Sequence, residues 1–141
     1  MLIANDWMLT AIYLVLLITF VLISNLLHNK FHISGKITRR IVHIGVGLTI
    51  CTTPFLLDYW LPPALLAVIF IFANTLAIKN KKMRGMHSAN RVSYGTVFFP
   101  ITYLVLILLF WQDSPEIIVI SMLILTISDP IAAIVGKQYG E

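Results

Sequence analysis

Five long apolar stretches alternate with short polar ones along the chain. The apolar stretches cover residues 8–27, 41–57, 61–78, 96–111 and 117–136. Each is close to the ~20 residues that a membrane-spanning helix needs. Hydrophobic residues make up 59% of the chain, charged residues only 11%, and the mean hydropathy is +0.92, which lies outside the range of soluble domains. The pattern therefore predicts an all-α, polytopic membrane helix bundle of about five transmembrane helices, forming a single integral-membrane domain.

The basic residues predict the orientation of this bundle. All ten Lys and Arg side chains lie in the stretches 28–40 and 79–95 or at Lys137, and the turns between the other span ends contain none. Because cytoplasmic loops are enriched in Lys and Arg, we expect a multi-pass protein with its N-terminus outside and its C-terminus in the cytoplasm. These loops are short and poor in aromatic residues, so we expect no nucleic-acid partner.

In this topology, four spans place a polar or ionisable residue near the cytoplasmic face. His43 and Asn74 lie about one turn inside their spans, and Gly95 and Thr96 open the fourth span. Asp129 lies roughly 20 Å from the outer end of its span, in a bilayer whose apolar core is about 30 Å thick. An aspartate at this depth costs on the order of 2.5–3.5 kcal/mol and usually faces the bundle interior or a polar cavity. The sequence therefore predicts one site facing the cytosol.

The residues around Asp129 also have a purely structural interpretation. An aspartate followed by Pro130 is typical of an N-cap with proline at the first helical position, so a new helix would begin there. Gly136 and Gly140 would then form a contact face of small residues that lets helices approach. A helix broken inside a membrane normally lines a cavity, and its N-terminus favours a phosphate group. Both interpretations remain open from the sequence.

Three motifs in order carry a resemblance to a known family. They are "DPIAAIVGKQYG" from Asp129 to Gly140, "RRIVHIGVG" from Arg39 to Gly47, and "NRVSYGTVFFP" from Asn90 to Pro100. The first has the spacing D-x-x-A-x-x-x-G-x-x-x-G. This set resembles the CTP-dependent polyprenol and lipid kinases, which include dolichol kinase, phytol kinase and the CTP-type diacylglycerol kinase and are related to phosphatidate cytidylyltransferases. In that family the first motif continues into a lysine-rich turn and further spans, so the resemblance implies the N-terminal part of a kinase, truncated at its C-terminus.

The resemblance implies a role for each candidate residue. Asp129 would bind Mg²⁺ and bring it to the phosphates of CTP, the expected phosphoryl donor. His43 would act as general base toward the lipid hydroxyl, or is a buried histidine satisfied by a neighbouring helix. Asn74 would orient the nucleotide or bond across helices, and Thr96 would contact phosphate or cap its span. The implied nucleotide-binding residues are Arg40, Asn74, Arg91, Gly95, Thr96, Ala132, Gly136, Lys137 and Gly140.

Three functions follow as hypotheses. The first is transfer of the γ-phosphate of CTP to a membrane lipid alcohol such as phytol, a polyprenol or diacylglycerol. The second is cytidylyl transfer to a lipid phosphate, as in the related cytidylyltransferases. The third is a non-catalytic membrane remnant or subunit, a possible oligomer or the partner of a complementing C-terminal half.

Overall fold

The computed structural model describes residues 2–79 and 95–139, which form five long α-helices and one helix of a single turn. The helices are α1 (Leu2–Phe31), α2 (Gly35–Ile50), α3 (Thr53–Leu56), α4 (Leu61–Lys79), α5 (Gly95–Phe110) and α6 (Pro115–Tyr139). Within these two ranges there is no strand, so the predicted helical bundle is confirmed.

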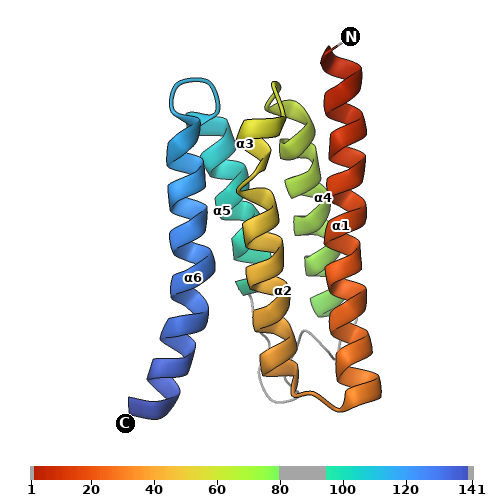
Figure 1. Cartoon of the computed structure of the whole chain (residues 1–141), viewed down its shortest axis with the longest axis vertical. Helices are drawn as coiled ribbons and strands as arrows, with labels where there is room; N and C mark the ends of the chain where they lie inside the picture. The colour runs from red at the N-terminus through yellow and green to blue at the C-terminus, as the bar shows by residue number, and fades with distance from the viewer. Residues whose placement is uncertain (1, 80–94, 140–141) are drawn as a thin grey trace.

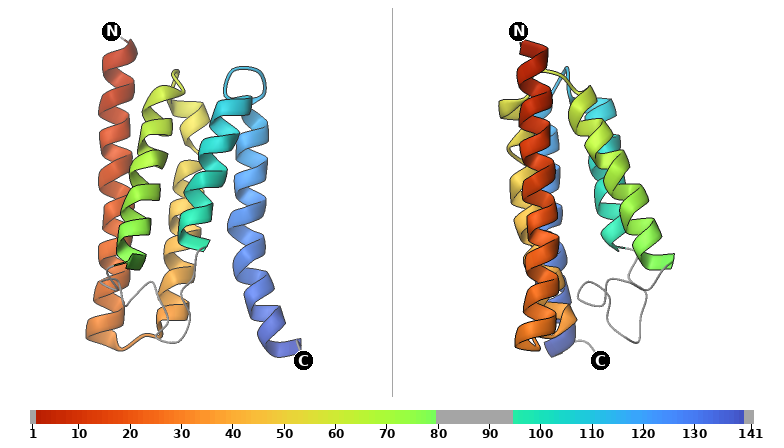
Figure 2. Two further views of the ribbon diagram at one scale, coloured as in Figure 1. Left: turned by 180° about the vertical axis from the view of Figure 1, so that it is seen from behind. Right: turned by 90° about the vertical axis from the view of Figure 1, so that its right-hand side faces the viewer.

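The long helices run alternately in opposite directions and form two layers (Figures 1 and 2). In one layer, α2 lies between α1 and α6; in the other, α4 packs against α5. Contacts of α1 with α4 and of α5 with α6 join the layers. The right panel of Figure 2 shows that the layers are close at the end carrying the N-terminus and α3, and separate toward the opposite end. We call these the closed end and the open end.

Three helices are long and apolar enough to cross a membrane. They are α1 over Asn5–Phe31, all of α4, and α6 over Pro115–Gly136. The 16-residue helix α5 is apolar throughout but only about 24 Å long. The equally short α2 has Arg39 and Arg40 in its second turn. Within the described ranges, therefore, three of the five predicted spans have full spanning length, and the count of five stays a prediction.

Two helices extend further into the polar stretches than expected. α1 begins at Leu2 and not near residue 8, and α2 begins at Gly35 and not at residue 41. Lys and Arg are good helix formers, so the basic residues of 28–40 continue the helices and leave a turn of three residues. In that turn His32 has a φ of 52°, and the ring Nδ1 of His28 lies 2.9 Å from the carbonyl oxygen of Ile33. The turn is thus compact.

The second predicted span is interrupted before its end. α2 stops at Ile50, and α3 starts at Thr53 with Pro54 in its first turn, where a missing N–H costs nothing. The hydroxyls of Thr52 and Thr53 donate to the carbonyls of Thr49 and Ile50, each at 2.7 Å. These bonds satisfy backbone groups that α2 leaves unpaired as it ends.

The helix break considered at Asp129 and Pro130 does not occur. α6 continues through both residues to Tyr139. Pro130 removes only one backbone hydrogen bond, whereas ending a helix in apolar surroundings would leave several backbone groups unpaired. The proline does kink the helix, and Figure 1 shows the part of α6 near the C-terminus leaning away from the bundle.

The closed end contains the buried core. Its largest fully buried apolar side chains are Ile107, Ile118 and Met122. Two hydroxyl pairs at 2.5 Å, Tyr13 with Thr52 and Thr53 with Tyr103, connect the end of α2 to α1 and α5. The packing that joins the two layers is therefore concentrated at the end opposite Lys30, Arg39 and Lys79.

Asp6 provides a further tie at the closed end. Its side chain is 1% exposed, although the residue was expected to precede the first span. One carboxylate oxygen, Oδ2, accepts the backbone N–H groups of Asp58 at 3.1 Å and Tyr59 at 2.9 Å. The indole Nε1 of Trp111 donates to the carbonyl oxygen of Asp58 at 3.4 Å. Asp6 thus fastens α1 to the turn that precedes α4, and α5 is held to the same turn.

Candidate functional site

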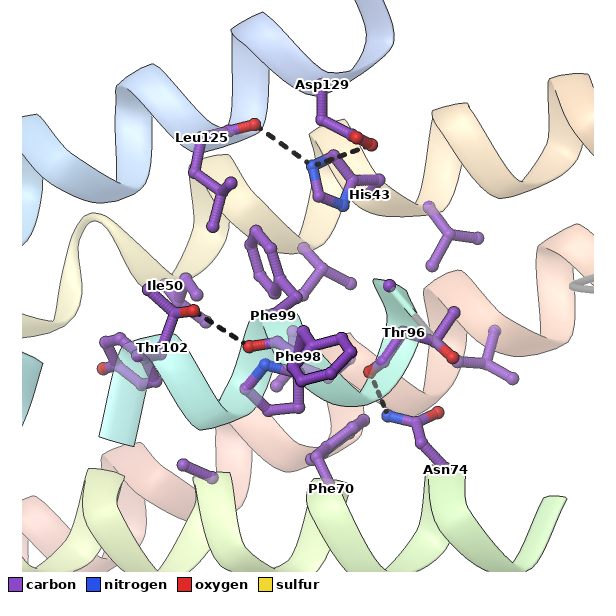
Figure 3. Close-up of a pocket in the computed structure, with 18 of the residues that line it drawn as sticks. His43, Ile50, Phe70, Asn74, Thr96, Phe98, Phe99, Thr102, Leu125 and Asp129 are labelled. Atoms are coloured by element: carbon purple, nitrogen blue, oxygen red, sulfur yellow. Dashed lines mark hydrogen bonds and ion pairs between the residues drawn. The ribbon is translucent and has the colours of Figure 1, made fainter. Parts of the chain in front are cut away.

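A cavity of about 260 Å³ lies between the two layers, with walls from all five long helices. Figure 3 shows its polar and aromatic side chains converging from α2, α4, α5 and α6. The residues that line it are Leu17, Val21, Arg39, Val42, His43, Val46, Ile50, Leu66, Ala67, Phe70, Asn74, Gly95, Thr96, Phe98, Phe99, Pro100, Thr102, Tyr103, Leu125 and Asp129. The wall is mostly apolar, with a small polar group toward the open end.

The polar group comes from four helices. Arg39 lies in the second turn of α2 and Thr96 in the first turn of α5, Asn74 lies in the C-terminal half of α4, and His43 and Asp129 lie near the middle of α2 and α6. These positions meet at one level of the bundle because neighbouring helices run in opposite directions. The cavity therefore has a polar mouth and an apolar interior.

His43 is the residue that joins the two layers at this mouth. Its ring Nε2 lies 3.4 Å from the carbonyl oxygen of Leu125 and 4.0 Å from Oδ2 of Asp129. On its other side the ring meets Phe99 edge to face, with centroids 4.6 Å apart. The side chain of His43 is 17% exposed and that of Asp129 is 56% exposed. The imidazole is therefore positioned by protein, while the carboxylate remains accessible to a ligand.

The contact with Leu125 bears on the tautomer of the His43 ring. A carbonyl oxygen only accepts hydrogen bonds, so this contact requires a proton on Nε2. In a neutral imidazole the other nitrogen, Nδ1, then has the free lone pair. In this tautomer Nδ1 can accept a hydrogen bond.

Gly47 sets the distance between α2 and α6 one turn beyond His43. A methyl group at Gly47 would lie 2.1 Å from Oγ1, 2.5 Å from Cγ2 and 2.8 Å from Cβ of Thr126. These separations are far below van der Waals contact, so only glycine allows the two helices this close. The approach brings His43 within reach of Leu125 and Asp129.

Asn74 holds the second layer at the mouth. Its Nδ2 donates to the backbone carbonyl oxygen of Thr96 at 3.1 Å. This bond joins the C-terminal part of α4 to the first turn of α5, across the segment 80–94 that connects them. It is the bond across helices that the sequence left as one of two alternatives for Asn74.

The structure brings together five of the predicted site residues and separates others from them. His43, Asn74, Gly95, Thr96 and Asp129 all line the cavity. The half-buried Arg40 does not, and its neighbour Arg39 takes that place. Ala132 and Gly136 are exposed on α6 beyond the cavity, and Lys137 lies on the same helix. Arg91 and Gly140 lie outside the described residues.

Two residues of the site were missed by sequence reasoning. Arg39 was given a topological role, because two adjacent arginines cannot be assigned to helix faces until the helix start is known. Gly47 was noted in the "RRIVHIGVG" motif, but its contact with Thr126 was not foreseen. Its spacing of four residues from His43, which places both on one helix face, was the available signal.

His, Cys, Asp and Glu side chains are the possible ligands for a metal ion within residues 2–79 and 95–139. No group of three or more His, Cys, Asp or Glu side chains comes together there to hold a metal ion. Mg²⁺, however, keeps several waters and is usually bound by one or two carboxylates together with substrate phosphates. A single accessible carboxylate such as Asp129 fits that donor set and does not fit a site formed by protein ligands alone.

The fold and the site together define a helical bundle that can span a membrane and contains a cavity with a polar mouth. No protein-family model matches the chain, and no solved structure matches it significantly. A curated protein, the phytol kinase of Synechocystis sp., is 30% identical over 127 residues, which cover 86% of this chain and 52% of that relative. The chain is thus similar to a phytol kinase over most of its own length and spans about half the length of that relative.

Proposed function

We propose that this chain provides the acceptor and phosphate-binding part of a lipid alcohol kinase that uses CTP. The observation that carries the proposal is the convergence of His43 and Asp129 at the mouth of an otherwise apolar cavity. The similarity to a phytol kinase supports the reaction class. The preference for CTP rests on the family resemblance of the three sequence motifs.

In the proposed reaction, the hydroxyl of a lipid alcohol lies at His43 with its hydrocarbon chain in the apolar cavity. Nδ1 of His43 accepts the hydroxyl proton as the alcohol oxygen forms a bond to the γ-phosphorus. The bond from that phosphorus to the bridging oxygen breaks, and its electron pair leaves with CDP. The imidazolium that results is balanced by the carboxylate 4.0 Å away.

The other polar residues hold the phosphates in this proposal. Arg39 offers two parallel donors to phosphate oxygens at the mouth, and Arg40 on α2 and Lys137 on α6 are further cationic residues of the same helices. Asp129 would hold Mg²⁺, which supplies charge neutralisation on the β- and γ-phosphates when it is bound. We also propose that this mouth faces the cytoplasm, because Lys30, Arg39 and Lys79 lie at the same end of the helices α1, α2 and α4.

The test is a transfer assay on the native protein in lipid vesicles. CTP labelled at the γ-phosphate is supplied with phytol, and lipid phosphate and CDP are measured. Asp129→Asn should abolish transfer, and His43→Gln should lower it by about 10²–10⁴-fold, the usual contribution of a general base. Asp113→Asn, an exposed carboxylate at the closed end, is the matched control and should leave transfer unchanged.

The products separate the proposal from its alternatives. Release of pyrophosphate with a cytidylyl lipid would replace the kinase with a cytidylyltransferase. Absence of nucleotide consumption by the native protein would favour a non-catalytic subunit. Normal turnover by Asp129→Asn would refute the role given to that carboxylate.

A further inference from the structure

We propose that the cavity is a chain-binding channel that holds the segment of the acceptor next to its hydroxyl inside the bundle, and excludes acceptors with two chains. The inference rests on the proposed function in one respect, namely that the hydroxyl lies at His43. It adds the path of the acceptor's hydrocarbon chain, the length of that hydrocarbon chain that the protein contacts, and the kinds of lipid alcohol that fit.

The first support is a gradient from polar to apolar residues that four helices share. From the mouth inward, α2 presents His43, Val46 and Ile50; α4 presents Asn74, Phe70 and Ala67; α5 presents Thr96, Phe99 and Tyr103; and α6 presents Asp129 and Leu125. From the mouth inward, residue numbers increase along α2 and α5 and decrease along α4 and α6. Because these helices run in opposite directions, all four polar-to-apolar gradients point from the open end toward the closed end. A ligand with one polar and one apolar end matches this arrangement.

The interior ends in a floor of buried side chains. Ile50 and Leu66 are each 4% exposed, and Tyr103 is 2% exposed. The Tyr103 hydroxyl is already paired with Thr53, so the ring presents its apolar face to the cavity. The channel is therefore closed at this depth to water and to the hydrophilic part of a ligand.

The length of the channel limits how much of the chain fits. Ile50 follows His43 by seven residues on the same helix, which corresponds to about 10 Å. A saturated chain advances about 1.2 Å per bond, as in an extended backbone, so the channel accepts roughly eight carbons. The cavity of about 260 Å³ is also below the range of roughly 300–1,000 Å³ that drug-sized ligands occupy. The remainder of a longer chain leaves the cavity at its side, where Phe98 lines the wall and is 63% exposed.

The channel selects by shape, because lipid tails are as apolar as its walls and burial alone gives little gain. Diacylglycerol begins both acyl chains within a few atoms of its hydroxyl, so the second chain would meet the channel wall. A single-chain primary alcohol has no such branch. The geometry therefore favours single-chain alcohols and makes the protein indifferent to chain length beyond the channel.

The experiment is photolabelling of the native protein in phosphatidylcholine vesicles without nucleotide. Two single-chain primary alcohols are used, one with a diazirine within the segment expected to be buried and one with it near the far end. The first should label Ile50, Leu66 or Tyr103, and excess phytol but not dioleoylglycerol should suppress the labelling. The second should label none of these residues. Labelling of outward-facing residues alone by the first probe, or equal competition by dioleoylglycerol, would overturn the inference.

A substitution provides the second measurement. Ala67→Phe places a ring in the channel and should abolish labelling of Ile50, whereas Leu65→Phe, on the exposed side of the same helix, should not. The outcomes also separate this inference from the proposed kinase. Labelled channel residues without phosphoryl transfer would refute the kinase and keep the chain-binding site. If Ala67→Phe prevents labelling of the channel but phosphoryl transfer continues, the kinase is kept and the channel is refuted as the binding site of the acceptor chain.

Discussion

Replacing Gly47 with alanine tests the spacing of α2 and α6 on which the site depends. The added methyl group would lie 2.1 Å from Oγ1 and 2.5 Å from Cγ2 of Thr126, and rotation about χ1 can move both atoms away. It would also lie 2.8 Å from Cβ, which rotation cannot move. Reaching an ordinary contact of 3.4 Å from that atom requires 3.4 − 2.8 = 0.6 Å of separation between the helices. The clash therefore cannot be relieved by side chains alone.

The expected cost has a structural and a functional part. Overpacking of this kind typically costs about 1–3 kcal/mol of unfolding free energy, which lowers the melting temperature by several degrees in a chain of this size. His43 lies one turn away, so its distances to Leu125 and Asp129 increase together. Because a misplacement of about 1 Å costs up to about 10²-fold in rate, we expect transfer to fall by roughly ten- to a hundred-fold.

The assay is thermal unfolding in mild detergent, together with the transfer assay, on four proteins. Gly136→Ala is the matched control, because no atom lies within 4 Å of its added methyl group, and it should be at least as stable as the native protein. Thr126→Gly removes all three clashing atoms, so Gly47→Ala combined with Thr126→Gly should recover much of the loss. A Gly47→Ala protein as stable as the native one, or a double variant no better than the single, would refute the reasoning.

Three further substitutions test the contacts that hold the layers. Asp6→Ala should lower the free energy of unfolding, measured by chemical denaturation, by about 1.5–3 kcal/mol, because two backbone N–H groups lose their charged acceptor. The control Asp58→Asn changes an exposed side chain and should leave stability unchanged. Equal stability of the two variants would contradict this reasoning. Asn74→Ala should cost about 1 kcal/mol and raise KM for the nucleotide as α5 loosens; an unchanged KM would show that the bond does not position the mouth. Tyr103→Phe loses its bond to Thr53 and should cost about 1 kcal/mol with no change in kcat, so a large fall in kcat would argue against a purely apolar floor.

The helical bundle and the convergence of its polar residues were predictable from the sequence. Composition indicates a membrane protein, and counting residues from each span end places His43, Asn74 and Asp129 at a common depth. Depth along a helix depends only on its rise per residue, which is nearly constant. The structure indeed brings these three residues to one cavity.

Rotation about each helix axis was not predictable in the same way. The side chains of adjacent residues on a helix point in directions about 100° apart. An error of a few residues in the predicted start of α2 is therefore enough to assign Arg40 to the cavity in place of Arg39. The continuity of α6 through Pro130 was also missed, because the Asp-Pro pair is a local signal and the apolar surroundings of the helix outweigh it. The approach of Gly47 to Thr126 depends on which helices are neighbours, which no local pattern contains.

The carboxylate of Asp6 has a consequence for the biogenesis of this protein. Its backbone partners at Asp58 and Tyr59 follow it by 52 and 53 residues. At a synthesis rate of about 5–20 residues per second, the Asp6 carboxylate is made about 3–10 s before its two backbone partners. The bonds that fasten the closed end therefore form only after α2 and α3 have been made, although α1 can pack against α2 before then.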